Sequence, residues 1–198
     1  MSRRLASILI ASIAVAALAE PAPAQTRVDF GPVAGLFLPL LDPGRDLWGP
    51  AGGLQGRLWV RPRFGAQLQV TWAYSRVGGG PNPGGYDIPS ISALVMTATA
   101  QAIYRVPLAP RGDLVWFGGG VGLVRREGHA YASYGDPMQF APTLSVGRAV
   151  PIGGRLCAIV GLTTALYWLD IRDGTGMSYE RGFQVDPLFH VALSWGWP

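Results

Sequence analysis

The stretch from residue 183 to residue 197 constrains the fold more than any other part of the sequence. Its alternate positions are large and apolar: Phe183, Val185, Phe189, Val191, Leu193, Trp195 and Trp197. The positions of the other parity include Gln184, Asp186, His190, Ala192, Ser194 and Gly196. A period of two with one nearly pure apolar face is typical of a β-strand and excludes a helix here.

The same alternation recurs along the chain and predicts eight strands. The other seven lie near residues 28–38, 51–60, 64–74, 91–104, 114–124, 141–150 and 156–169. The fifth stretch is rich in glycine, so its two faces are not distinguished by the pattern. Pro32, Pro142 and Pro187 each remove a ladder hydrogen bond, so the strand boundaries near them are open by a few residues.

Short and long connections alternate between these strands. They are short around residues 61–63, 107–113 and 151–155, and long around 39–50, 76–89, 126–139 and 170–182. The long connections are rich in Gly, Pro, Asp and Tyr, which favour turns and contribute little to a packed core. This order predicts hairpins in an up-and-down, all-β arrangement.

The residues between the apolar positions decide which all-β architecture fits. A β-sandwich or a soluble barrel would turn the apolar faces inward and would need many charges outside. Only 14% of the residues are charged, and the second face consists of Gly, Thr, Gln and Ser. Apolar stretches of about nine to eleven residues are long enough to cross a membrane as tilted strands. The sequence therefore predicts an eight-stranded antiparallel transmembrane β-barrel with a polar interior.

Composition and the N-terminus indicate an exported protein of one domain. Arg3 and Arg4 precede an apolar run from residue 5 to 18, and Ala22-Pro23-Ala24 follows. This pattern predicts a signal peptide over residues 1–24 and a mature barrel over residues 25–198. All 16 basic residues are arginines and they are scattered, so no nucleic-acid-binding stripe is present.

Aromatic and charged residues lie near the predicted strand ends. The sequence predicts an aromatic girdle of Trp72, Tyr74, Tyr167 and Trp168 at the long-loop ends, and of Trp59, Phe64, Tyr104, Trp195 and Trp197 at the short-turn ends. Seven arginines lie on the short-turn side, namely Arg27, Arg61, Arg63, Arg105, Arg111, Arg148 and Arg155, with only Asp29 and Asp113 as acids.

The chain resembles the small eight-stranded outer-membrane β-barrels, of the OmpA-transmembrane-domain and OmpX kind. The features that carry this resemblance are the signal peptide, the hairpin from Gly53 to Val70 and the alternating last strand. The resemblance covers residues 25–198 and implies the cell outer membrane, with both termini in the periplasm. It also implies that the barrel-assembly machinery reads the aromatic end of the last strand, here Trp195 and Trp197. The chain departs from that pattern by ending in Pro198.

Catalytic and metal-binding patterns are weak. His190 has Asp186 and Ser194 four residues away on either side, and four residues of strand span ~13 Å. A catalytic group needs its partner within about 3 Å, so these residues do not form a triad. No cluster of His or Cys has metal-ligand spacing, and no cofactor is expected.

The inward parity predicts a closed polar core in the lumen. Its expected members are Asp29, Gln55, Arg57, Gln67, Gln69, Thr97, Thr99, Gln101, Gln184, Asp186 and His190. An eight-stranded barrel is just wide enough for such side chains to fill. Arg57 is expected to be the one inward cation and to contact Asp29, directly or through water, while Asp186 lies nearer the long loops.

The sequence thus predicts a monomeric, non-enzymatic outer-membrane protein with a plugged lumen and a structural or surface-interaction role through four long extracellular loops. Its expected partners are outer-membrane lipid, the barrel-assembly machinery and an extracellular ligand. Two alternatives stay open, namely a narrow channel for small or apolar solutes and an enzyme that modifies lipid A.

Overall fold

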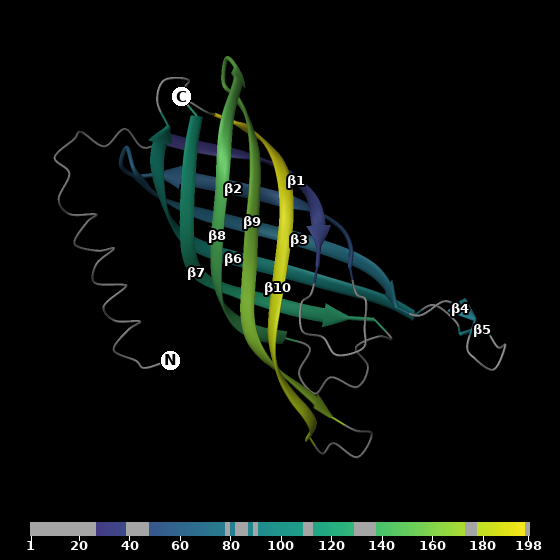
Figure 1. Cartoon of the computed structure of the whole chain (residues 1–198). Coiled ribbons are helices and arrows are strands. Elements are labelled where there is room, and N and C mark those ends of the chain that lie inside the picture. Colours follow the sequence, from purple (N-terminus) through teal and green to yellow (C-terminus); the bar gives the residue numbers. More distant parts are fainter. Residues whose placement is uncertain are drawn as a thin grey trace, which may run out of the picture.

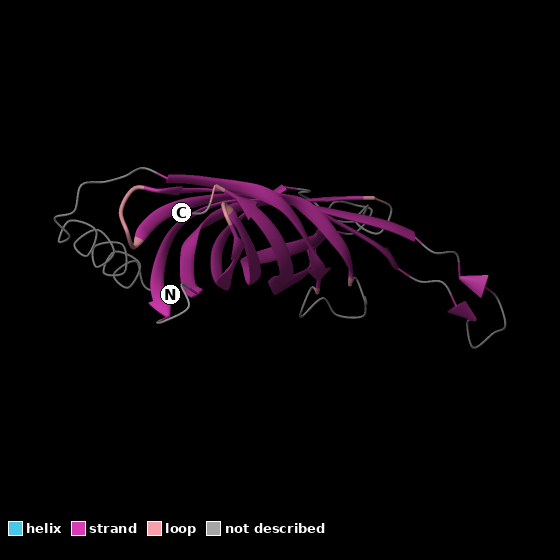
Figure 2. Cartoon of the chain, turned by 90° about the horizontal axis from the view of Figure 1, so that it is seen from above, coloured by secondary structure: helices cyan, strands magenta, loops and turns pink. Residues whose placement is uncertain are grey.

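The computed structural model describes residues 27–38, 48–77, 80–81, 87–88, 91–108, 113–128, 138–172 and 178–196. The predicted signal peptide and Trp197, one of the two residues predicted to act as the assembly signal, lie outside these residues. Strands and their connections make up this part of the chain (Figure 2). Among the described residues, no helix is long and apolar enough to cross a membrane.

Eight strands close into one antiparallel barrel, as predicted (Figure 1). They are β1 (Arg27–Phe37), β2 (Gly49–Trp59), β3 (Phe64–Val77), β6 (Ile91–Leu108), β7 (Asp113–Glu127), β8 (Met138–Gly153), β9 (Leu156–Arg172) and β10 (Ser178–Trp195). Each barrel strand pairs with the barrel strands before and after it in the chain, and β1 pairs with β10 to close the barrel. The topology is therefore up-and-down.

The two ends of the barrel differ. The short-turn end carries the start of β1, the connections β2–β3, β6–β7 and β8–β9, and the end of β10. The long-loop end carries the other connections, one of which contains the small hairpin of β4 (Gly80–Pro81) and β5 (Asp87–Ile88). In Figure 1 this hairpin lies far from the end of β10, which is at the short-turn end.

The exterior of the barrel is apolar. In β3 the side chains of Leu68 and Val70 are 64% and 39% exposed, whereas Gln69 between them is 2% exposed. The same alternation of exposed and buried residues runs through β8 from residue 140 to residue 150. Because apolar side chains cover the outside, while polar side chains lie inside together with clusters of buried apolar ones, the barrel is suited to lipid rather than to water.

The glycine-rich strand β7 has defined faces in the structure. Trp116, Val124 and Arg126 are buried, whereas Phe117 and Val121 are more than half exposed. The even-numbered residues of β7 therefore face the lumen.

The three prolines lie inside strands rather than at their ends. Pro32 pairs with β2, but no pairing of Gly31 or Pro32 with β10 occurs among the described residues. Pro142 pairs with β7 and lies just beyond the pairing of β8 with β9. Pro187 pairs with β9 and lies one residue beyond the pairing of β10 with β1. Each proline thus lies at a gap or just beyond the end of one of its two ladders, although the carbonyl oxygen of Pro187 still accepts a hydrogen bond from the backbone nitrogen of Leu38 at 3.0 Å.

Candidate functional site

The residues predicted to fill the lumen lie inside the barrel and form its polar core. Those that are buried are Asp29, Gln55, Arg57, Gln67, Gln69, Thr99, Gln101, Gln184, Asp186 and His190. Thr97 is half-buried and lines an internal cavity. The polar core has three levels along the barrel axis, joined by side chains that reach from one wall to another.

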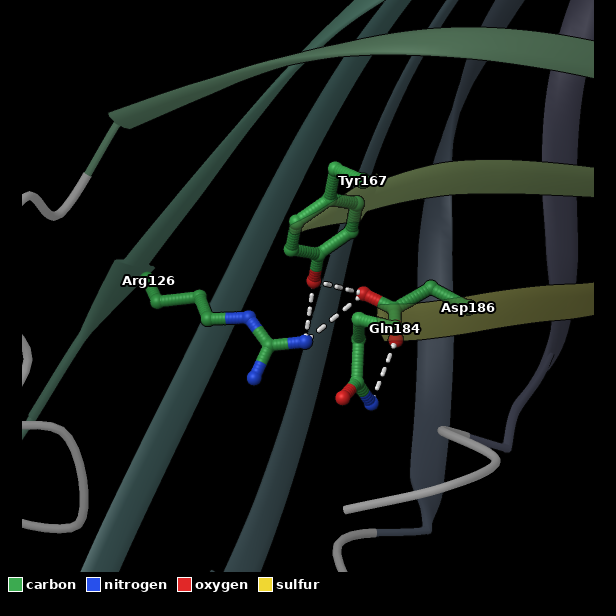
Figure 3. A network of polar contacts seen from close by, with 4 residues as sticks. All are labelled: Arg126, Tyr167, Gln184 and Asp186. Carbon is green, nitrogen blue, oxygen red and sulfur yellow. Dashed lines mark hydrogen bonds and ion pairs between the residues drawn. The ribbon is translucent and has the colours of Figure 1, made fainter. Parts of the chain in front are cut away.

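The level nearest the long-loop end contains an ion pair (Figure 3). Arg126 of β7 donates from Nη2 to Oδ2 of Asp186 on β10 at 2.8 Å. Tyr167 of β9 hydrogen-bonds to both Arg126 and Asp186, and Gln184 donates to Oδ1 of Asp186 at 3.3 Å. Three strands thus contribute to one network with both charges buried.

Arg126 corrects the prediction that Arg57 is the one inward cation. The sequence Arg125-Arg126-Glu127-Gly128 resembles the start of a loop, but β7 extends through Glu127. Arg126 shares the parity of Trp116 and Val124, which carries it into the lumen. The sequence did not show which face of β7 turns toward the lumen, because a run of glycines gives no contrast between the two faces. Arg126 could therefore not be assigned to the lumen.

The middle level joins β3, β6 and β8. Gln101 on β6 donates to Oγ1 of Thr143 at 3.0 Å and accepts a hydrogen bond from Ser145 at 2.7 Å. Both partners are on β8, so these contacts pass over β7. They can do so because β7 presents Gly118, Gly120 and Gly122 to the lumen, and a Cβ at Gly118 would collide with the Ser145 hydroxyl. The glycines leave room for side chains from both neighbouring strands.

The level nearest the short-turn end is built around Arg57. Its Nε donates to Oε1 of Gln67 at 2.7 Å, and its guanidinium carbon lies 4.5 Å from the ring centroid of Trp116. Arg57 on β2 therefore reaches across the lumen to β7, where cation–π attraction adds to packing.

Asp29 is the register partner of Arg57, but the two side chains do not make the direct contact that was one form of the prediction. The Asp29 oxygens accept hydrogen bonds from Trp59 Nε1 at 2.8 Å and from Ser194 Oγ at 2.7 Å. No ion pair joins Arg57 to Asp29 in the described part of the chain. Sequence reasoning missed Trp59 and Ser194 as the donors that bind this carboxylate.

Trp59 and Tyr167 also correct the predicted aromatic girdle. Both are buried in the lumen, at 2% and 4% exposure, instead of facing lipid. Their parity pointed inward, because Trp59 shares a face with Arg57 and Tyr167 shares one with Thr163. Exposed aromatic side chains at the two ends include Trp72, Tyr74, Trp168 and Trp195. At the short-turn end the rings of Phe64 and Tyr104 are 4.9 Å apart.

The structure does not bring His190, Asp186 and Ser194 together as a triad. Ser194 donates to Asp29, Asp186 binds Arg126, and Nδ1 of His190 lies 3.4 Å from the carbonyl oxygen of Leu188. Among the described residues, no group of His, Cys, Asp and Glu is arranged to hold a metal ion.

A small cavity lies between the level nearest the long-loop end and the middle level. Its lining includes Gln69, Thr71, Thr97, Thr99, Thr163 and Asp186, together with apolar side chains. Nε2 of Gln69 and Oγ1 of Thr99 are buried without a hydrogen-bond partner in the described protein. Buried polar groups are normally satisfied, so this cavity is chemically suited to water.

Comparison with solved structures identifies the fold as that of small outer-membrane barrels. Neisserial surface protein A superposes with a TM-score of 0.55 and 11% identity, covering 87% of this chain and 97% of that chain. The outer membrane protein OprG from Pseudomonas aeruginosa gives a TM-score of 0.54 and 10% identity, with the same coverage of 87% and 97%. No protein-family model and no curated protein sequence matches the chain. This fold and the apolar exterior agree with the predicted location in the outer membrane.

Proposed function

We propose that this chain is a non-enzymatic outer-membrane protein with a plugged lumen, which acts at the cell surface through its long connections. The observation that carries the plug is the crossing of the lumen by hydrogen-bonded and stacked side chains at separate levels. Arg126 reaches Tyr167 and Asp186 at one level, and Arg57 reaches Gln67 and Trp116 at another. A solute would have to break both sets of contacts to pass.

The position of the long connections between strands supports the surface role. The connections at the long-loop end are the long ones, which in barrels of this type face outward. One protein with this fold is named a surface protein. On this proposal residues 1–24 are removed on export and residues 25–198 form a monomeric barrel. The assembly machinery then recognises the strand end at Trp195 and Trp197.

Planar-bilayer recording of the purified protein tests the plug. The wild-type barrel should show no steady conductance. The double variant Arg57→Ala, Arg126→Ala removes the two cations that cross the lumen and should show small openings. Steady porin-like conductance of the wild type would contradict the plug and support the alternative of a narrow channel, which the internal cavity favours.

A binding comparison on whole cells tests the surface role. Cells that display the wild-type protein are screened against extracellular proteins and glycans, alongside cells whose protein carries Gly-Ser turns in place of residues 39–47, 78–90, 129–137 and 173–177. Binding should be lost with the long connections while the barrel remains in the membrane. Binding that survives the replacement would place the interaction elsewhere. Lipid A that changes in mass when the protein is expressed would contradict the non-enzymatic assignment.

A further inference from the structure

The barrel wall is split between β8 and β9 at the long-loop end. The ladder between these two strands ends with the pair of Thr143 and Ala165. Both strands continue past this pair, β8 in register with β7 as far as Met138, and β9 in register with β10 as far as Arg172. Residues 140–142 and 166–168 therefore lie on the two sides of a split in the wall.

The residues beside the split account for its position. Pro142 follows directly on the last pair of the ladder, and its nitrogen has no hydrogen to donate to a neighbouring strand. Phe140 and Trp168, one on each side of the split, point outward and are 79% and 67% exposed. On this side β9 has lost the backbone hydrogen bonds that hold a strand in a sheet.

The ladder on the other side of the β9–β10 hairpin ends at a similar height. The last described pair of β10 with β1 is Leu188 with Phe37, and Leu188 is the register partner of Thr163, two residues from Ala165. Beyond this level, residues 166–172 of β9 and 178–186 of β10 pair with each other. This segment, named the flap here, runs past the end of β8 in Figure 1.

Side chains at the base of the flap connect it to the rest of the barrel. Arg126 of β7 donates to Tyr167 and Asp186, which both belong to the flap, although β8 lies between β7 and β9 (Figure 3). The side chains of the ion pair are both 2% exposed. A two-stranded ribbon is only marginally stable by itself. The contacts of Arg126 therefore stabilise the flap against the barrel just beyond the last backbone pair with β8.

The internal cavity borders the base of the flap. Its lining includes Ala165, the last residue of β9 that pairs with β8, and Asp186 of the flap. Gln69 and Thr99 line it from β3 and β6. A movement of the flap away from the barrel would thus carry off part of the cavity wall and the carboxylate of the ion pair together.

We propose that the flap is a hinged element that Arg126 latches shut, and that its release opens the lumen from the long-loop end down to the internal cavity. Elements that move in this way are drawn from the least stable parts of a fold. The inference rests on the proposed plug only in that the latch is the level nearest the long-loop end. It does not depend on the surface role.

Distances between pairs of spin labels in lipid nanodiscs, measured by pulsed electron paramagnetic resonance, test the proposal. In a Cys157→Ala background, labels at Phe140→Cys and Trp168→Cys lie on the two sides of the split. Adding Asp186→Asn breaks the latch and should lengthen this distance by about 5 Å or more, which is one interstrand spacing. Adding Tyr167→Phe instead removes only one hydroxyl from the latch and should give a smaller shift.

The matched control pair is Leu144→Cys with Thr164→Cys, which are register partners on the same two strands just below the split. Their distance should stay unchanged when Asp186→Asn is added. The mobility shift of unheated samples on gels verifies that each variant is folded. An unchanged distance across the split after Asp186→Asn would overturn the proposal, and so would an equal lengthening of the control distance, since the whole wall would then have loosened. Steady conductance of the wild type would contradict the plug without altering these distances.

Discussion

Replacing Asp186 by asparagine should destabilise the barrel because it leaves the Arg126 charge buried without its counter-charge. Both side chains of this ion pair are only 2% exposed, and their nitrogen–oxygen distance is 2.8 Å. Removing one partner of a buried pair typically costs about 3–5 kcal/mol. We expect Asp186→Asn and Arg126→Gln each to lower the free energy of unfolding by this amount. The double variant should cost roughly 2–3 kcal/mol less than the sum of the two single variants.

Urea titrations of refolding into lipid vesicles, followed by tryptophan fluorescence, measure these free energies. The adjacent residues provide a control, since Arg125 and Glu127 form an ion pair whose side chains are 51% and 38% exposed. Glu127→Gln should cost no more than about 1 kcal/mol because water screens an exposed pair. Additive effects at Arg126 and Asp186, with a coupling energy below about 0.5 kcal/mol, would refute the buried ion pair.

Three further predictions concern the wall and the assembly of the barrel. Val70→Arg places a charge in lipid and should cost roughly 2–4 kcal/mol, whereas Gln69→Arg points into the lumen and should cost less; equal losses in refolding titrations would show that the faces are reversed. Gly120→Ala puts a Cβ against the backbone of β6 and should cost about 1–3 kcal/mol, whereas its outward neighbour Gly119→Ala should stay within about 0.5 kcal/mol in the same titrations. Deleting residues 195–198 leaves unpaired backbone groups in lipid, so membrane fractionation should find the protein degraded or periplasmic; normal outer-membrane levels would contradict the role of this strand end.

The fold could be predicted from the sequence because one physical signal repeats in every strand. In lipid, the exterior of a barrel must be apolar, so the parity of residues such as Leu68 and Gln69 states which side of the wall they occupy. The prolines did not obscure this signal, since Pro32, Pro142 and Pro187 each lie at a gap or just beyond the end of one ladder.

The partners inside the lumen could not be predicted in the same way. The alternation along a strand indicates that Asp29 and Arg57 face inward. It does not indicate which side chains of other strands they contact inside the barrel. Trp59 and Ser194 donate hydrogen bonds to the two carboxylate oxygens of Asp29. Arg57 instead contacts Gln67 and Trp116. Contacts of this kind depend on the shape of the closed barrel, which no single strand encodes.

The glycines show how the lumen accommodates its large side chains. Trp59 lies over Gly65, Trp116 lies over Gly147, and His190 lies over Gly161. In each case the glycine is the cross-strand register partner of the ring. A Cβ at any of these glycines would come within 2.9 Å of the ring.

Glycine is unfavourable within a strand, because it loses more backbone entropy on folding and has no side chain to pack. A ring that packs over a cross-strand glycine offsets the missing side-chain contacts. The same arrangement accounts for the inward position of Trp59, since the space above Gly65 accepts an indole ring and its Nε1 reaches Asp29 from there. The parity of Trp59 therefore decides that it faces the lumen, and the cross-strand glycine Gly65 makes room for its ring there.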